Sequence, residues 1–262
     1  MQKIKVVILD GGGTVWDSMH VLYESYLWAF EKLGIPREKF PLSMKHANML
    51  SALKDFNSEH EKAKGFLALY LLGYKAEDFL KAQDPNEKLL QIVEKAKNQF
   101  SDFDRLSKKL GDLLEKYLYE IFDDTKYPLC KNAKQALKIF KEELNLKICL
   151  VSNRKRASTL RILQSHDILK YFDVVLAKED QPKPKPNPEG VIKALSYCSA
   201  KPEQSVFIGD SAVDIISAKL ANVSCIGVLT GMGDEELLKK AGANIVVETL
   251  LEAAEFLKNK IY

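Results

Sequence analysis

The sequence is poor in cysteine, and no cysteines are spaced as metal ligands or as a redox pair. Its 262 residues include four cysteines that lie far apart and form no CxxC motif: Cys130, Cys149, Cys198 and Cys225. A zinc centre or a disulfide framework needs cysteines at characteristic, closer spacings. A chain of this length can also bury a core without covalent staples. We therefore expect buried, reduced thiols in a protein of the cytoplasm.

The chain also lacks long apolar runs and a charge excess of either sign. One of its longest apolar runs is 66–72, whereas a membrane-spanning helix needs about 18 residues. The first apolar run, 6–9, ends at Asp10, too early for the core of a signal peptide. Lys and Arg number 39 and Asp and Glu number 36, a net charge of +3. This balance disfavours nucleic acid and membranes as partners. The sequence carries no signal for the oligomeric state.

β-branched residues are rare between residues 17 and 124. Five occur in these 108 positions: Val21, Ile35, Ile92, Val93 and Ile121. Leu, Ala, Lys and Glu fill the segment at helical spacing, and strands favour β-branched residues more than helices do. The segment is therefore predicted to be entirely helical. Four stretches predict the breaks between helices: 34–36, 73, 84–85 and 101–102.

Outside this segment, short β-rich runs alternate with helical patterns. The runs cover 5–9, 147–151, 174–176, 205–208, 224–228 and 245–247. Such alternation predicts an α/β domain with a doubly wound parallel sheet. We expect an α/β core domain of residues 1–16 and 126–262, and an inserted all-helical cap domain of residues 17–125. An insert directly after one strand is expected to form a lid over the carboxyl edge of the sheet, where α/β domains bind ligands.

Polar segments follow or adjoin four of these predicted elements. They are Asp10-Gly11-Gly12-Gly13-Thr14, Ser152-Asn153-Arg154, Lys183 to Pro188, and Gly209-Asp210-Ser211 with Asp214. Taken singly, each is also explained as a turn or a helix N-cap. Taken together they indicate a site, because the carboxyl ends of parallel strands meet at one edge of the sheet.

These segments resemble, in order and over the whole chain, the four motifs of the haloacid dehalogenase superfamily. The run from Asp10 to Thr14 is similar to the first motif, DxDGT, and the strand that ends at Ser152 is similar to the second. A lysine ahead of a helix matches the third, and Gly209-Asp210-Ser211 with Asp214 matches the fourth, GDSxxD. The resemblance implies a Rossmann-like core with a helical first-class cap. It also implies a magnesium-dependent phosphatase of the phosphoglycolate-phosphatase type, acting on a small phosphorylated metabolite.

The resemblance and the chemistry of phosphoryl transfer together imply a nucleophile and a metal site. Asp10 is the expected nucleophile, which forms an aspartyl-phosphate. Mg²⁺ prefers carboxylate and carbonyl oxygens. Its expected ligands are Asp10, the backbone carbonyl of Gly12, Asp210 and Asp214.

Phosphate binding and charge neutralisation are assigned in the same way. Gly11, Gly13, Thr14, Ser152 and Asn153 are expected to bind the phosphate through backbone N–H groups and side chains. A lysine should neutralise the phosphate and the clustered carboxylates, whose repulsion would otherwise raise their pKa values. Both Lys183 and Lys185 fit the KPxP pattern; Lys183 is preferred and Lys185 is the alternative.

Gly12 departs from the family's pattern, because the phosphatases of the family carry Asp at this position. That Asp protonates the leaving oxygen and later activates water, and loss of a general acid–base group costs about 10²–10⁴ in rate. One interpretation is a phosphatase in which Asp17, His20 or a good leaving group compensates. Another is a carbon–phosphorus hydrolase that resembles phosphonoacetaldehyde hydrolase, with Lys45 as a Schiff-base lysine. A third is a non-catalytic protein that binds a phosphorylated ligand.

Overall fold

The computed structural model describes residues 3–51 and 53–261, and its contacts divide the chain into two compact units. The first unit is Met1–Ser18 with Asp124–Tyr262, and the second is Met19–Asp123. The boundaries expected from the sequence were 16/17 and 125/126. The observed boundaries lie two residues inside the helical segment at each end.

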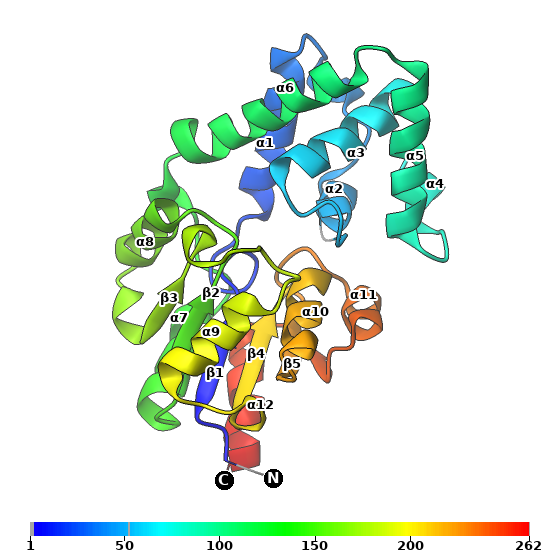
Figure 1. Cartoon of the computed structure of the whole chain (residues 1–262). Coiled ribbons are helices and arrows are strands. Elements are labelled where there is room, and N and C mark those ends of the chain that lie inside the picture. The colour runs from blue at the N-terminus through cyan, green and yellow to red at the C-terminus, as the bar shows by residue number, and fades with distance from the viewer. Residues whose placement is uncertain (1–2, 52, 262) are drawn as a thin grey trace. The chain divides into compact units, whose positions relative to one another are not determined.

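The first unit contains a six-stranded, all-parallel sheet, which confirms the predicted fold class. Its strands are β1 (Val6–Leu9), β2 (Lys147–Val151), β3 (Val174–Leu176), β4 (Ser205–Gly209), β5 (Ser224–Val228) and β6 (Ile245–Val247). Their order in the sheet is β3-β2-β1-β4-β5-β6 (Figure 1). The order reverses between β1 and β4, and α/β sheets bind ligands beyond the strand ends at such a point.

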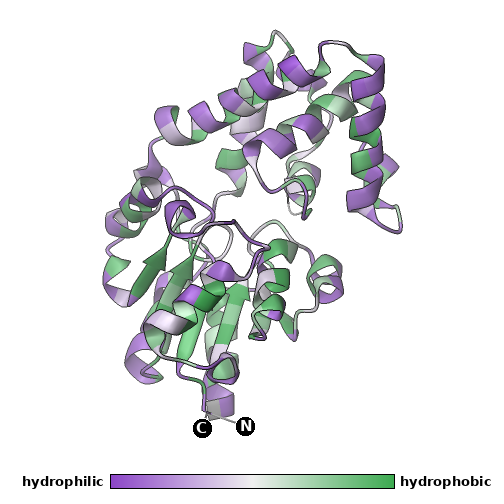
Figure 2. Cartoon of the chain, in the orientation of Figure 1, coloured by the Kyte–Doolittle hydropathy of each residue, from purple (hydrophilic) through white to green (hydrophobic). Residues whose placement is uncertain are grey.

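Helices cover both faces of this sheet, which explains why the central strand β1 is apolar throughout. They are α7 (Ala133–Lys138), α8 (Arg156–Ser165), α9 (Glu189–Cys198), α10 (Ala212–Leu220), α11 (Glu235–Ala241) and α12 (Leu250–Ile261). Val6 and Ile8 share one core with Val191 of α9 and Ile215 of α10. Side chains alternate along a strand, so Val7 points to the opposite face, which is also buried. Figure 2 accordingly shows the central strands as hydrophobic.

The second unit is entirely helical, as the scarcity of β-branched residues predicted. Its helices are α1 (Met19–Lys32), α2 (Met44–Ser51), α3 (Glu59–Leu72), α4 (Glu77–Leu80), α5 (Pro85–Gln99) and α6 (Phe103–Lys116). The four predicted breaks lie between α1 and α2 and along α3 to α6, whereas the break between α2 and α3 was not predicted. Gly73 ends α3 in a left-handed conformation, with φ of 70°, and the Asp84 side chain accepts hydrogen bonds from the first turn of α5.

Aromatic side chains form the core of the helical unit. The rings of Tyr26 and Phe66 lie 4.6 Å apart, and Phe40 lies 5.0 Å from Phe30 and 5.4 Å from Phe66. All four side chains are buried. Burial of aromatic rings contributes strongly to packing, so these residues are explained as core of this unit.

The two segments that link the units pair with each other inside the first unit. The Asp17 N–H donates to the Pro128 carbonyl at 2.8 Å, and the Cys130 N–H donates to the Val15 carbonyl at 3.0 Å. The chain therefore leaves and re-enters the α/β unit at adjacent points. All four cysteines of the chain are free and buried in this unit.

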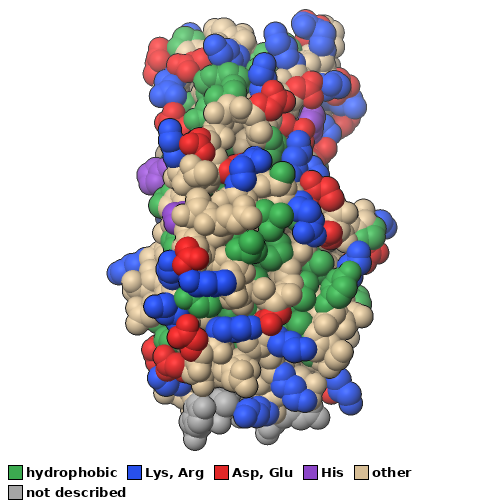
Figure 3. Space-filling view, turned by 90° about the vertical axis from the view of Figure 1, so that its left-hand side faces the viewer, with side chains coloured by type: hydrophobic (Ala, Val, Ile, Leu, Met, Phe, Trp, Pro, Cys, Tyr) green, Lys and Arg blue, Asp and Glu red, His purple; other side chains and the backbone are tan. Residues whose placement is uncertain are grey.

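Two features of the structure concern binding to nucleic acid or membranes: the distribution of surface charge and the length and hydropathy of the helices. On the face shown in Figure 3, Lys and Arg side chains are spread out with Asp and Glu between them. Among the described residues, no helix is both long enough and apolar enough to cross a membrane.

Candidate active site

Three aspartates meet at the carboxyl edge of the sheet, at the point where its strand order reverses. Asp10 follows β1, and its backbone N–H donates to the Ile208 carbonyl of β4 at 3.0 Å. Asp210 follows β4, and Asp214 lies in the first turn of α10. One carboxylate oxygen from each of the three lies within 4.8 Å of the others, and all three side chains are buried. The structure thus brings together the three carboxylates predicted from the sequence.

Lys185, rather than the preferred Lys183, is the cation of this cluster. Its Nζ contacts the Asp10 carboxylate, lies 2.6 Å from Asp214 Oδ1, and donates to the Val151 carbonyl at 2.9 Å. Lys185 is 2% exposed, whereas Lys183 is exposed to solvent. The prediction of Lys183 was therefore wrong, and its alternative holds the position.

Asn153 explains which lysine enters the site. Its Oδ1 accepts a hydrogen bond from the Lys185 N–H at 2.9 Å, and its Nδ2 donates to the Lys185 carbonyl at 3.2 Å. Both backbone groups of Lys185 are thereby held against the end of β2. These two bonds make the Asn153 amide a positioning group for Lys185. Binding of phosphate by Asn153 stays a prediction.

Burial and the unequal charges set the electrostatics of the cluster. Burial raises the pKa of Asp10 to about 6, with Lys185 opposing the shift and Asp214 adding to it. Burial, then Asp214 and Asp10, also raise the pKa of Asp210. For Lys185, burial lowers the pKa but Asp10 and Asp214 outweigh it, so the pKa is raised. The ammonium of Lys185 thus contacts two carboxylates of a cluster that holds three.

This donor set fits a magnesium ion. Three buried carboxylates with a single ammonium leave negative charge uncompensated, and Mg²⁺ binds carboxylate oxygens. Two of the carboxylates are already oriented: the Met232 N–H donates to Asp210 Oδ2 at 2.8 Å, and the Ser211 hydroxyl donates to Asp214 Oδ2 at 2.5 Å. Asp10, Asp210 and Asp214 would hold the ion. The Gly12 carbonyl stays a predicted ligand.

The glycine-rich loop after β1 is closed by its own backbone bonds. The Gly13 N–H donates to the Trp16 carbonyl at 2.7 Å, and the Thr14 N–H donates to the Gly11 carbonyl at 3.4 Å. The Thr14 hydroxyl is buried and donates to Asp210 Oδ1 at 3.4 Å. Gly13 and Thr14 therefore shape the loop and contact Asp210, and their binding of phosphate stays a prediction. The Gly11 N–H bonds to Asp10 and lowers the pKa of its carboxyl.

The segment after β5 belongs to the site, although none of its residues is among the predicted site residues. The Thr230 hydroxyl donates to the Gly13 carbonyl at 2.5 Å, and the Gly233 N–H donates to the Asp210 carbonyl at 2.8 Å. A Cβ on Gly231 would overlap the Asp210 carboxylate, as would one on Gly13, whose φ is +84°. Asp210 is thus enclosed between two glycines. The run Thr230-Gly231-Met232-Gly233 was the available signal.

The remaining predicted residues lie in different surroundings. Ser152 is buried at the end of β2, where its hydroxyl accepts a hydrogen bond from the Arg154 N–H at 3.2 Å. Asp17 is half-buried in the first unit. His20 and Lys45 are exposed residues of the helical unit, on α1 and α2.

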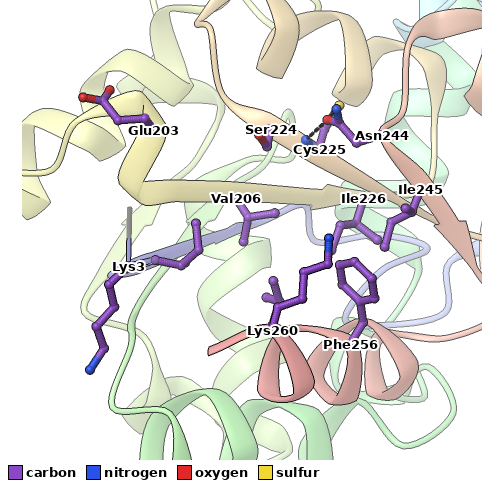
Figure 4. A pocket seen from close by; sticks show the side chains of 12 residues that line it. Lys3, Glu203, Val206, Ser224, Cys225, Ile226, Asn244, Ile245, Phe256 and Lys260 are labelled. Atoms are coloured by element: carbon purple, nitrogen blue, oxygen red, sulfur yellow. Dashed lines mark hydrogen bonds between the residues drawn. The ribbon is translucent and has the colours of Figure 1, made fainter. Parts of the chain in front are cut away.

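A separate cavity of about 640 Å³ opens in the first unit, beside α12. Figure 4 shows Val206 and Ile226 of the sheet facing Phe256 of α12. None of the three clustered aspartates, nor Lys185, lines it. The carboxylate cluster is therefore distinct from this cavity.

Comparison with known proteins agrees with the fold and the motifs. The family model described as haloacid dehalogenase-like hydrolase matches residues 4–222. The chain is 32% identical over 139 residues to a protein named "Putative pyrophosphatase PpaX" from Caldanaerobacter subterraneus subsp. tengcongensis, covering 53% of this chain and 63% of that protein. It is 33% identical over 104 residues to "Phosphoglycolate phosphatase" from Salmonella typhi, covering 40% and 41%. These matches span less than two thirds of either relative.

Solved structures show the same fold over the whole chain. A crystal structure titled "putative phosphoglycolate phosphatase" from Lactobacillus delbrueckii subsp. bulgaricus aligns with a TM-score of 0.77 at 19% identity. The alignment covers 98% of this chain and 99% of that chain. This similarity extends to the helical segment as well as the sheet.

Proposed function

Because the chain belongs to the haloacid dehalogenase-like hydrolases, we propose that it is a magnesium-dependent phosphatase of small phosphorylated metabolites. The observation that carries the proposal is the Asp10 carboxylate, which lies at the end of β1 in contact with Lys185 and beside Asp210 and Asp214. A nucleophile, a cation and a set of oxygen donors at one sheet edge are the parts that phosphoryl transfer requires.

The residues of the cluster have separate roles in the proposed reaction. An Asp10 oxygen attacks the phosphorus, forming an acyl phosphate as the bond to the leaving oxygen breaks. Water then cleaves the acyl phosphate and restores the carboxylate. Lys185 keeps Asp10 charged and offsets charge on the phosphate. When bound, Mg²⁺ would supply further positive charge at the phosphate oxygens. Ser152, at the end of β2, is proposed to contact a phosphate oxygen.

The names of the relatives support the substrate class. One similar protein is named as a pyrophosphatase and another as a phosphoglycolate phosphatase. Both names describe removal of a phosphoryl group from a small molecule. We extend that class to this chain, with the helical unit as its cap and the cytoplasm as its compartment.

The test is metal-dependent hydrolysis by the purified chain. We expect phosphate release from p-nitrophenyl phosphate or pyrophosphate to stop with a chelator and to return with added Mg²⁺. Asp210→Asn should need a higher Mg²⁺ concentration for half-maximal rate, because it removes one negative oxygen donor. Turnover that persists in the chelator would contradict the metal assignment. Tight binding of inorganic phosphate with no turnover of any phosphate compound would favour the non-catalytic alternative.

A further inference from the structure

The Trp16 indole occupies the space that a side chain at position 11 would need, and it lies next to the space of a side chain at position 12. A Cβ on Gly11 would overlap the Trp16 ring. A Cβ on Gly12 would lie 3.5 Å from the indole Nε1 and 2.9 Å from the Ser18 Oγ. Gly12 and Trp16 also pair as an isolated β-bridge. The ring edge that carries the N–H is therefore next to the bare backbone of Gly12.

The indole N–H has no acceptor. Trp16 is 1% exposed, and its Nε1 is a buried donor without a hydrogen-bond partner within the described chain. Buried donors are nearly always satisfied, and an unsatisfied one lowers stability. A group that binds at this point and offers an oxygen would satisfy it.

The N–H lies in the same loop as the groups that surround the proposed nucleophile. On one side of Gly12, the Gly11 N–H bonds to the Asp10 carboxylate. On the other side, Gly13 lies against the Asp210 carboxylate and accepts a hydrogen bond from Thr230 at its carbonyl. Gly12 is thus flanked on both sides by residues that touch carboxylates of the cluster.

We propose that the Trp16 N–H binds an oxygen of the group that leaves the phosphorus, and that the enzyme is thereby selective for phosphoric anhydrides of the pyrophosphate and acyl phosphate type. The inference rests on the proposed function and names its substrate class. An indole N–H is a donor only, so it stabilises a departing anion but supplies no proton.

The chemistry of the leaving group explains this selectivity. As Asp10 forms its bond to phosphorus, the electrons of the breaking P–O bond pass to the leaving oxygen. A phosphate or carboxylate departs as an anion without taking up a proton, whereas an alkoxide needs one. Water then attacks the acyl phosphate and yields the Asp10 carboxylate and dihydrogen phosphate, which releases a proton to solvent. No co-reactant besides water is required.

Binding of a non-hydrolysable anhydride tests the subsite without turnover. Imidodiphosphate carries a second phosphoryl group in the leaving position, and inorganic phosphate does not. With Mg²⁺ present, we expect Trp16→Phe to weaken imidodiphosphate binding about tenfold in calorimetry, because one hydrogen bond to a charged oxygen is lost. Inorganic phosphate should bind within about twofold of its original affinity. Trp28→Phe, which changes the other tryptophan, on α1 of the helical unit, is the matched control and should change neither affinity.

Two further measurements keep the test decisive if Trp16→Phe folds poorly. Gly12→Ala leaves the indole in place but puts a methyl group beside its Nε1, and it should also weaken imidodiphosphate binding. In the Trp28→Phe variant, Trp16 is the single tryptophan, and its fluorescence should change more with imidodiphosphate than with phosphate.

The outcomes separate this inference from the proposed function. If wild-type chain hydrolyses phosphate compounds but both variants bind imidodiphosphate as tightly as wild type, the subsite is overturned and the phosphatase stands. If wild type hydrolyses nothing, yet imidodiphosphate binding depends on Trp16, the subsite stands and the phosphatase falls. A further confirming result is an approximately tenfold smaller ratio of pyrophosphate to alkyl phosphate kcat/KM in Trp16→Phe.

Discussion

The α/β unit buries two groups of charged side chains that differ in their balance of charge: Asp124 with its arginines, and the three aspartates with Lys185. Asp124 is 3% exposed and accepts hydrogen bonds from Arg154 at 2.9 Å, Ser158 at 2.7 Å and Arg161 Nε at 3.0 Å. Two guanidinium groups thus form ion pairs with one carboxylate. At the sheet edge the ratio is reversed: among the described residues, Lys185 is the one cation in contact with the cluster of Asp10, Asp210 and Asp214, through Asp10 and Asp214.

This difference separates a structural ion pair from a site prepared for ligands. Every oxygen of Asp124 is bonded within the protein, and Arg154 is held further by Tyr127, whose hydroxyl lies 3.0 Å from its Nη2 and whose ring centroid lies 4.6 Å from its guanidinium carbon. The Asp10 cluster retains excess negative charge in a buried position, which is unfavourable unless a cation binds. We therefore expect changes to the first cluster to alter stability and changes to the second to alter activity.

The largest effect is expected for Asp10→Asn. The amide keeps the shape of the side chain but cannot attack phosphorus, so phosphate release should fall at least about 10³-fold. The free energy of unfolding in urea should not decrease, because one buried negative charge beside Asp214 is removed. A variant that kept a tenth of the original rate would rule out Asp10 as nucleophile.

The next largest effect should distinguish two neighbouring lysines. Lys185→Met removes an ammonium that contacts Asp10, and we expect a loss of about 10²–10³ in kcat/KM. Lys183→Met is the matched control on the same loop, and its kcat/KM should stay within about twofold because Lys183 is exposed. Equal losses of kcat/KM in the two variants would contradict the placement of Lys185 in the site and of Lys183 in solvent. Circular dichroism would establish that both variants fold.

Gly12→Asp adds the acid–base group that the chain lacks at this position, so it should raise activity rather than lower it. Gly12 is not among the glycines with positive φ, and the nearest atom to a new Cβ is the Ser18 hydroxyl, which can rotate away. The added carboxyl group should donate a proton to the leaving oxygen, so hydrolysis of an alkyl phosphate should rise about 10²-fold. The rise should be smaller for an aryl phosphate. A folded variant with unchanged Mg²⁺ affinity and no gain on either ester would show that another group already supplies the proton.

The smallest effect on activity is expected for the structural cluster. Asp124→Asn leaves Arg154 without its buried counter-charge and should lower the free energy of unfolding by about 2 kcal/mol. This is less than for a fully buried ion pair, because solvent screens the half-exposed Arg161. The kcat of the folded protein should stay within about twofold. Arg161→Gln, at the exposed end of the cluster, should cost less than about 1 kcal/mol. Urea unfolding curves measure both values, and a larger loss in Arg161→Gln would reverse this ranking.

The fold was readable from the sequence because its signals are local. A strand such as Val6–Leu9 is buried on both faces, so an unbroken apolar run identifies it without its neighbours. The helical unit is recognised by its few β-branched residues, by Gly73, which ends a helix, and by Asp84-Pro85, which begins one. The position of the site also follows from chain order, because the residues after parallel strands meet at one edge.

The choice between chemically identical neighbours depended on contacts between distant segments. Lys183 and Lys185 both precede proline, and the two hydrogen bonds from Asn153, 32 residues earlier in the chain, select Lys185. The same reasoning applies to Thr14, whose hydroxyl meets Asp210 from 196 residues away. Nothing in the local sequence distinguishes a side chain that contacts a ligand from one that donates a hydrogen bond to a carboxylate of the protein.

The sequence by itself determined the α/β class and the helical insertion, because hydrophobic periodicity and the order of elements are properties of the chain. Its resemblance to the family motifs singled out the three clustered aspartates. Only the tertiary structure decided that Lys185 is their cation, that the segment after β5 encloses Asp210, and that the Trp16 N–H beside Gly12 has no acceptor in the described part of the chain. These features depend on where side chains far apart in sequence come to rest, and packing, rather than local propensity, sets those positions.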